Sequence, residues 1–166
     1  HVLKRPDVYI GSTRLRTTDE YIVSDTFKIE KKTIEVSPAL IRIFIEPLSN
    51  AIDNLARSRQ NGVKATKICI TIDEKTGETS FWNDGEVIPI ELHPTENCYN
   101  HSLIFGQLLT SSNYNDEKDR IDISGLNGIG IKACSVFSSR FEIEGADPHN
   151  KKKLIQVWTD NMKNTT

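Results

Sequence analysis

The chain has 166 residues, a formal net charge of −2 and a hydrophobic content of 37%. This length suits one globular domain with a real core, and the nearly balanced charge excludes a global basic field for holding nucleic acid. No apolar run approaches the ~20 residues of a membrane-spanning helix. The three cysteines are widely spaced and form no CxxC pair, which favours free thiols in a reducing, intracellular compartment.

One long helix is predicted after a mixed N-terminal segment. Residues 1–36 carry only short strand-like pieces, at 8–10 and 21–23. The helix is predicted to begin with Ser37 as N-cap and Pro38 at its first position, and to end near Arg59, before Asn61 and Gly62. Pro47 lies inside it, where the missing N–H removes one backbone hydrogen bond and should kink or loosen the helix.

The rest of the chain alternates between hairpins and helices. Two hairpins are predicted, with strands at 67–73 and 78–82 and at 141–143 and 154–158. Residues 102–109 and 131–137 have helical patterns, and the polar stretch 110–124 indicates a mobile loop. This order predicts an α+β two-layer sandwich, with one mixed, mostly antiparallel sheet and helices on one face.

Three polar residues of the long helix stand four positions apart: Glu46, Asn50 and Asn54. Each step of four advances the side chain by only ~40°, so one carboxylate and two amides share a face. A carboxylate beside a triphosphate can orient an attacking water, and a neutral amide oxygen can bind Mg²⁺ without repelling the phosphates. Asn54 could reach the phosphates or the ribose. The alternative is an ordinary surface acid and two hydrogen-bonding amides.

The opposite face of this helix is apolar and is predicted to be buried. Its residues are Leu40, Ile41, Phe44, Leu48, Ala51, Ile52 and Leu55.

Two further motifs suit a nucleotide. The loop GLNGIGIK at 125–132 opens a helix, and its glycines allow backbone N–H groups to approach phosphates, with Lys132 adding a full positive charge. The spacing differs from both the Rossmann fingerprint and the P-loop. Asn83 follows a strand and precedes Gly85 and Ile88, so it could recognise a base edge. The alternatives are a glycine-rich turn before a core helix and a simple β-turn.

The order of these pieces resembles the GHKL ATPases. The strings KRPDVYIGS (4–12), LIFGQLLTSSNY (103–114), GLNGIGIKACSVFSSRF (125–141) and QVWTDNM (156–162) resemble the N-terminal ATPase domain of type IIA, eukaryotic-type, DNA topoisomerases. This resemblance covers nearly the whole chain and favours a large DNA virus, such as African swine fever virus, as the source. It implies the nucleus as the compartment for a eukaryotic protein, or the host cytoplasm for a cytoplasmic virus.

The resemblance implies a role for each motif. Glu46 corresponds to the catalytic base, Asn50 to the magnesium ligand, Asn54 to a nucleotide contact and Asn83 to the residue that recognises adenine. Further implied ATP-binding residues are Ile88, Ile104 and Phe105 at the base and sugar, Ser111, Ser112 and Asn113 at a lid, and Gly125, Asn127, Gly128, Ile129, Gly130, Ile131 and Lys132 in the phosphate loop. The implied cofactors are ATP and Mg²⁺. In the whole protein the implied partners are DNA, bound by other domains, and a second copy, with no membrane.

Some positions depart from the family pattern. Val87 replaces a second glycine after Asn83, Leu126 and Ile129 replace an arginine and an aromatic residue, and Pro47 is unexpected. The family's second domain, its DNA-cleavage residues and its exchanged N-terminal arm are not found. We therefore expect residues 1–166 to be a partial ATPase domain that binds ATP weakly or not at all and hydrolyses it very slowly.

Three other functions fit parts of the sequence. A different GHKL module, such as a chaperone or a mismatch-repair clamp, shares the fold, although LLTSSNY argues against it. A kinase of the histidine-kinase type would not need Glu46. A DNA-binding domain without catalysis conflicts with the acidic balance.

Overall fold

The computed structural model describes residues 2–107 and 130–166, which form an α+β fold. The helices are α1 (Pro6–Tyr9), α2 (Pro38–Gln60) and α3 (Gly130–Val136), with a 3₁₀ turn η1 (Val2–Lys4) and a π-helical turn η2 (Ser102–Gly106). The strands are β1 (Arg16–Val23), β2 (Ile29–Val36), β3 (Ile68–Ile72), β4 (Thr79–Asn83), β5 (Arg140–Asp147), β6 (Lys152–Thr159) and β7 (Asn164–Thr165).

The strands pair antiparallel throughout the described residues, in the orders β1-β2, β3-β4 and β5-β6-β7. The α+β class with antiparallel pairing is as predicted, but these pairs form three separate sheets where one mixed sheet was expected. Each sheet is built from strands that are consecutive in the chain and joined by short turns. Sequence alternation specifies such local pairs, whereas it does not say which hairpins join edge to edge.

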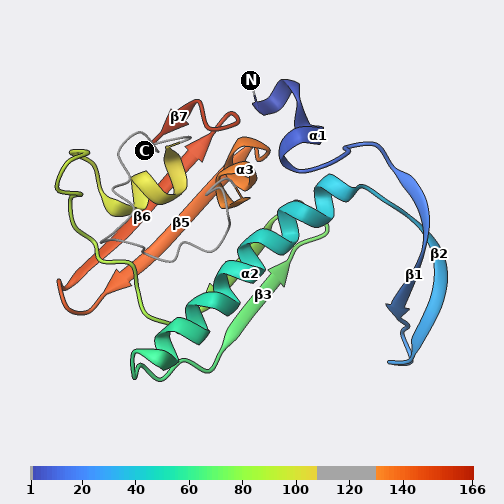
Figure 1. Cartoon of the computed structure of the whole chain (residues 1–166), viewed down its shortest axis with the longest axis horizontal. Coiled ribbons are helices and arrows are strands. Elements are labelled where there is room, and N and C mark those ends of the chain that lie inside the picture. The colour runs from blue at the N-terminus through green and yellow to red at the C-terminus, as the bar shows by residue number, and fades with distance from the viewer. Residues whose placement is uncertain (1, 108–129) are drawn as a thin grey trace.

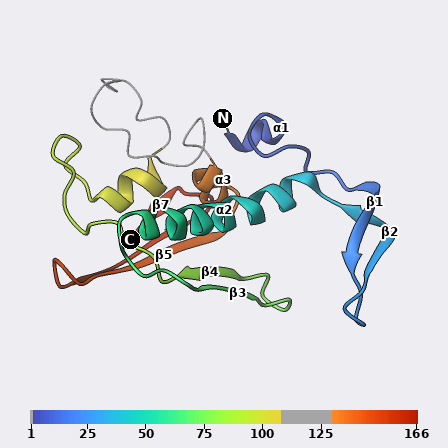
Figure 2. The same cartoon turned by 60° about the horizontal axis from the view of Figure 1, so that its bottom comes forward.

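Helix α2 occupies the centre of the molecule (Figure 1). The β3–β4 hairpin lies along one side of it and α3 along another, and α2 contacts both β4 and α3 (Figure 2). Phe44 of α2 packs edge-on against Phe81 of β4, with ring centroids 5.1 Å apart. The β1–β2 hairpin extends away from the rest beyond the N-terminal end of α2 (Figure 1).

The predicted ends of α2 are confirmed. Ser37 is extended (φ −93°, ψ 118°) directly before Pro38, and Gly62 has φ +78° directly after the C-cap Asn61. Such a left-handed residue ends a helix without strain only when it is glycine or, less often, asparagine. The Ser37 hydroxyl donates to the Ser12 carbonyl at 3.3 Å, so it fastens the N-terminal segment to the helix start.

The predicted apolar face of α2 is only partly correct. Ala51 and Leu55 are buried, and Phe44 and Leu48 are half-buried. Leu40, Ile41 and Ile52 are exposed, at 68%, 44% and 51%. Helix α2 contacts β4 and α3 in the described structure, and this packing leaves these three side chains exposed.

The Cys134 thiol lies at the backbone carbonyl that Pro47 leaves without a helical hydrogen-bond donor. Helix α2 continues through Pro47, which has no N–H to offer the carbonyl of Ile43, four residues earlier. The buried Cys134 thiol lies 3.3 Å from that carbonyl oxygen and 3.6 Å from the Gly130 carbonyl of its own helix, so the Ile43 carbonyl is the nearer acceptor for its single S–H. Burial, and secondly the negative charge of Glu46, raise the pKa of Cys134 to about 12, so the thiol keeps its proton at neutral pH. The Ile43 carbonyl, which has no helical donor because of Pro47, therefore accepts a hydrogen bond from a thiol on α3.

The segment before α2 departs most from prediction. Residues 8–10 were expected to be strand-like, but Pro6–Tyr9 form α1, because Pro6 suits a first helical position and its carbonyl accepts from Ile10 N at 2.9 Å. The strand-like piece at 21–23 is the end of β1, and its partner β2 was missed. The hairpins β3–β4 and β5–β6 are confirmed, the second with longer strands than predicted.

The pairing of Pro47 with Cys134 predicts a non-additive response. Pro47→Leu should stabilise the domain by ~1 kcal/mol or more, because it restores the backbone hydrogen bond to Ile43. Cys134→Ala should destabilise the wild type, and should cost ~0.5–1 kcal/mol less in the Leu variant, where the carbonyl has its own helical partner. Urea unfolding of the four proteins measures this coupling. Equal costs of Cys134→Ala in both backgrounds would contradict the pairing.

Candidate functional site

The carboxylate of Glu46 lies directly against the first residue of α3. A Cβ atom added to Gly130 would stand 1.9 Å from Glu46 Oε2 and 2.5 Å from its Cδ. The Glu46 side chain is only 16% exposed, and its Oε1 pairs with Nε of Arg42, one turn earlier. The acid of the long helix and the end of the glycine loop, far apart in the sequence, therefore meet. Glycine at 130 is a steric requirement of this contact.

The neighbouring predicted residues lie on the same two helices. Asn50 is half-buried one turn beyond Glu46, and Ile131 and Lys132 are half-buried in the first turn of α3. Burial lowers the pKa of Lys132, because a poorly solvated site disfavours the ammonium form. An amide oxygen, a carboxylate and an amine are thus available around the contact between α2 and α3.

The turn after β4 is fastened to α2 by the next residues of the polar row. Asn54 Nδ2 donates to Asn83 Oδ1 at 2.8 Å and to the Glu86 carbonyl at 3.1 Å. Asn83 Oδ1 also accepts from Gly85 N at 3.0 Å. The predicted nucleotide contact Asn54 and the predicted base-recognition residue Asn83 are therefore direct partners.

Asp84 fastens the same turn from its other side. Its Oδ1 accepts from Thr66 N at 2.9 Å and from Lys67 N at 2.8 Å, directly before β3. These contacts, that of Lys67 first, lower the pKa of Asp84. Gly85, the next residue of the turn, is crowded. A Cβ atom added to it would stand 2.6 Å from Asn54 Nδ2 and 2.8 Å from Asn83 Oδ1. The Asn-Asp-Gly turn is thus more constrained than an ordinary β-turn.

The segments predicted to hold the base and sugar approach each other over β5. The positions nearest to a Cβ on Gly145 are His101 Nε2 at 3.2 Å and Val87 Cγ2 at 3.7 Å. His101 stacks on Phe105 with ring centroids 6.5 Å apart. Ile88, Ile104 and Phe105 are all half-buried. Val87 therefore packs against Gly145 of β5.

Asp147 fixes the end of this segment. Its carboxylate accepts from Ile90 N at 2.9 Å, from His149 N at 3.0 Å and from Asn150 N at 3.1 Å. These bonds, that of Ile90 first, lower the pKa of Asp147 to about 2. Residues 83–90 are consequently held at one end by α2 and β3, and at the other by the β5–β6 hairpin.

Part of the predicted site lies outside the described residues. These positions are Ser111, Ser112, Asn113, Gly125, Asn127, Gly128 and Ile129. Gly130, Ile131 and Lys132 represent the phosphate loop within the structure.

Two residues at the site were missed by sequence reasoning: Arg42 and Ser58. Arg42 pairs with Glu46, and Ser58 lies beneath the Asn83 turn with its Oγ 2.7 Å from Glu86 N. Both continue the row of Glu46, Asn50 and Asn54 by one step of four, in opposite directions. Extending that spacing along the helix would have found them.

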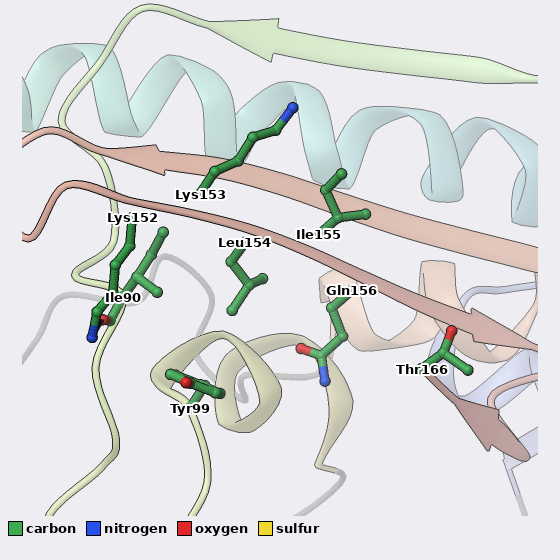
Figure 3. Close-up of a pocket in the computed structure, with 8 residues that line it drawn as sticks. All are labelled: Ile90, Tyr99, Lys152, Lys153, Leu154, Ile155, Gln156 and Thr166. Carbon is green, nitrogen blue, oxygen red and sulfur yellow. Dashed lines mark hydrogen bonds between the residues drawn. The ribbon is translucent and has the colours of Figure 1, made fainter.

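A groove of about 420 Å³ opens over β6 (Figure 3). Its lining residues are Ile90, Tyr99, Lys152, Lys153, Leu154, Ile155, Gln156 and Thr166. None of them is a predicted site residue. The groove is therefore distinct from the contact between Glu46 and Gly130.

The chain is similar in sequence to type II DNA topoisomerases of viruses and eukaryotes. The DNA topoisomerase 2 of Invertebrate iridescent virus 6 is 44% identical over 100% of this chain, which spans 15% of that relative. The DNA topoisomerase 2 of Penicillium chrysogenum is 45% identical over 98% of the chain, which spans 10% of it. The chain belongs to the type II DNA topoisomerase family.

Solved structures place the likeness in one region of that family. The crystal structure of the ATPase region of Saccharomyces cerevisiae topoisomerase II superposes with a TM-score of 0.88 at 39% identity, covering 100% of this chain and 43% of that one. No family model matches the chain. The chain is thus homologous to the topoisomerase II ATPase region, and these findings do not favour a chaperone or mismatch-repair clamp. None of the helices described here is long and apolar enough to cross a membrane.

The contact at Gly130 predicts that a side chain there must displace the carboxylate. Gly130→Ala should destabilise the domain by ~1–3 kcal/mol through overpacking. In a Glu46→Ala background the same change should cost at least ~1 kcal/mol less, because the colliding atoms are gone. Gly145→Ala, which approaches His101 instead, is the control and should cost the same in both backgrounds. Denaturant unfolding measures all six proteins, and additive effects of positions 46 and 130 would contradict the contact.

The contacts of Asp147 predict an acid-sensitive contribution to stability. Because its pKa is lowered to about 2 in the folded state, its contribution is complete above the unfolded value of about 3.9 and is lost as pH falls toward 2. The difference in unfolding free energy between wild type and Asp147→Asn should therefore be largest above about pH 5 and shrink below about pH 4. Urea titrations between pH 2.5 and 7 provide the measurement. A difference that stays constant over this range would contradict the assignment.

Proposed function

We propose that this chain binds ATP with Mg²⁺ at the contact between α2 and the start of α3, as the ATPase element of a type II DNA topoisomerase. The observation that carries the proposal is the position of the Glu46 carboxylate against Gly130, in a chain that is homologous to topoisomerase II ATPase regions over its whole length. A catalytic base must face the phosphates, and a glycine loop is where phosphates would lie.

The residues present fit a magnesium nucleotide. Mg²⁺ takes oxygen ligands and few of them from protein, which suits one amide oxygen from Asn50 near the carboxylate of Glu46. The half-buried Lys132, two residues beyond Gly130, offers a positive charge for the phosphates. When bound, the metal would supply positive charge that neutralises the phosphates.

Each protein group then has a distinct task. Glu46 would accept a hydrogen bond from the water that attacks the γ-phosphate, and so orient it. Arg42 pairs with Oε1 of that carboxylate, which limits its rotation. Lys132 would stabilise negative charge at the phosphates, and Asn83, on its constrained turn, would recognise adenine.

The wider role follows from the relatives rather than from this site. Because the chain spans only 10–15% of the relatives described above, the activity of the whole protein is part of the proposal. ATP binding would close two ATPase domains of a homodimer as a gate, and hydrolysis would reopen it. Other domains would bind, cut and pass DNA, in the nucleus or, for a cytoplasmic virus, in the host cytoplasm.

The decisive experiment is a titration with a non-hydrolysable ATP analogue, with and without Mg²⁺. NMR-detected binding up to millimolar concentrations would reveal even weak affinity. Binding should weaken about tenfold or more without Mg²⁺, and the Asn50→Ala variant should lose most of this metal dependence. Asn164→Ala, on the exposed strand β7, is the control and should behave as wild type.

Two outcomes would overturn parts of the proposal. A wild type that does not bind the analogue at millimolar concentration would overturn nucleotide binding by this chain. Binding that ignores both the metal and Asn50 would overturn the magnesium assignment alone.

A further inference from the structure

We infer that Ser58 is a positioning residue, which sets the orientation of Asn83 and thereby the preference for adenine over other bases. The inference rests on the proposed function, because Asn83 is taken as the group that meets the base. Ser58 itself lies behind the turn and would touch no nucleotide. Its effect would pass through the hydrogen bonds that join α2 to residues 83–86.

Ser58 is fully buried, and its hydroxyl both donates and accepts a hydrogen bond. Its relative exposure is 0%, and it is among the buried polar residues of the described chain. Oγ donates to the Asn54 carbonyl at 2.6 Å and accepts from Glu86 N at 2.7 Å. One hydroxyl therefore fixes the distance between α2 and the backbone just beyond Gly85.

The distance between α2 and this backbone determines whether the Asn54 side chain can make its hydrogen bonds. Asn54 Nδ2 reaches the Glu86 carbonyl at 3.1 Å only while the Glu86 backbone stays in place, and the same nitrogen donates to Asn83 Oδ1 at 2.8 Å. Asn54 Oδ1 accepts from Arg57 at 3.1 Å. Both ends of the Asn54 amide are thus occupied by protein.

The network assigns the amide of Asn83 without ambiguity. The backbone N–H of Gly85 can only donate, so the atom facing it at 3.0 Å is Oδ1 of Asn83. The carbonyl of Glu86 can only accept, so the Asn54 atom facing it is the NH₂ group, which again requires Oδ1 of Asn83. An amide presents opposite hydrogen-bonding patterns when it rotates by half a turn. Fixing its orientation therefore selects which base edge it can match.

The side chains of this network are closely packed around Gly85. A Cβ on Gly85 would stand 2.6 Å from Asn54 Nδ2, 2.8 Å from Asn83 Oδ1 and 3.0 Å from Ser58 Oγ. The three side chains therefore converge on one glycine. Loss of the Ser58 hydroxyl would deprive Glu86 N of its acceptor and free the turn to move, and with it the amide of Asn83.

The test compares Ser58→Ala with a matched control, Ser135→Ala. Ser135 is also buried in a helix, at 1% exposure, but its Oγ has no hydrogen-bond partner among residues 2–107 and 130–166. Affinities for the non-hydrolysable ATP and GTP analogues, with Mg²⁺, are measured by NMR titration. Ser58→Ala should reduce the adenine-over-guanine preference about tenfold, whereas Ser135→Ala should leave it unchanged. A purely structural serine would alter stability without moving this ratio.

Amide exchange gives a second readout that needs no nucleotide. Exchange at Glu86 N–H should be about tenfold faster in Ser58→Ala than in wild type, because its acceptor is removed. If Ser58→Ala does not fold, Gly85→Ala perturbs the same three side chains from the turn and should reduce the base preference in the same way.

The outcomes separate the two claims. A folded Ser58→Ala or Gly85→Ala that keeps the wild-type base preference would overturn the role of Ser58 while leaving nucleotide binding intact. Unchanged exchange at Glu86 would overturn it as well. A wild type that binds neither analogue would instead overturn the proposed function, and this inference with it.

Discussion

The contact between the carboxylate of Glu46 and the backbone of Gly130 sets the distance between α2 and α3, and the surrounding structure depends on that distance. Only glycine at 130 permits it, since a Cβ would stand 1.9 Å from Oε2. The same close approach buries Ala133 and Cys134 and brings the Cys134 thiol to the Ile43 carbonyl. Pro47 is tolerated in the middle of α2 because the Cys134 thiol of α3 replaces the backbone N–H that proline lacks. The contact between α2 and α3 thus involves all four residues: Glu46 and Pro47 on α2, and Gly130 and Cys134 on α3.

The polar row of α2 winds around the helix as it advances, by ~40° for each step of four. At one end the Arg42 side chain is 59% exposed, next to it Glu46 is 16% exposed, and at the other end Ser58 is fully buried. The row therefore passes from solvent, through the candidate site, to the interior behind the Asn83 turn. Its members differ in role because they face different surroundings: an ion pair at the surface, a carboxylate against α3, and hydrogen bonds that fix a turn.

Local signals in the sequence were enough for many elements. Proline and serine at the start of α2, glycine after its end, and the alternation in β3–β4 and β5–β6 each act over a few residues, and the structure agrees with them. Predictions that depended on distant partners did less well. The apolar residues Leu40, Ile41 and Ile52 were expected to be buried, and the hairpins to share one sheet, but both features depend on which elements pack together. The strand β2 was missed because its alternation is interrupted by charged residues on both faces.

For the candidate site, the sequence by itself determined which chemical groups are present and which of them share a helix face, because spacing along a helix fixes direction. It indicated a carboxylate and amides on one element and a glycine loop on another, with a resemblance to a family that joins them. Only the tertiary structure decided that Glu46 meets Gly130, that Asn54 bonds Asn83, and that Ser58 and Arg42 belong to the same row. The physical reason is that hydrogen bonds and steric contacts between elements act over about 3 Å, and no pattern within one element specifies which atoms of another will come that close.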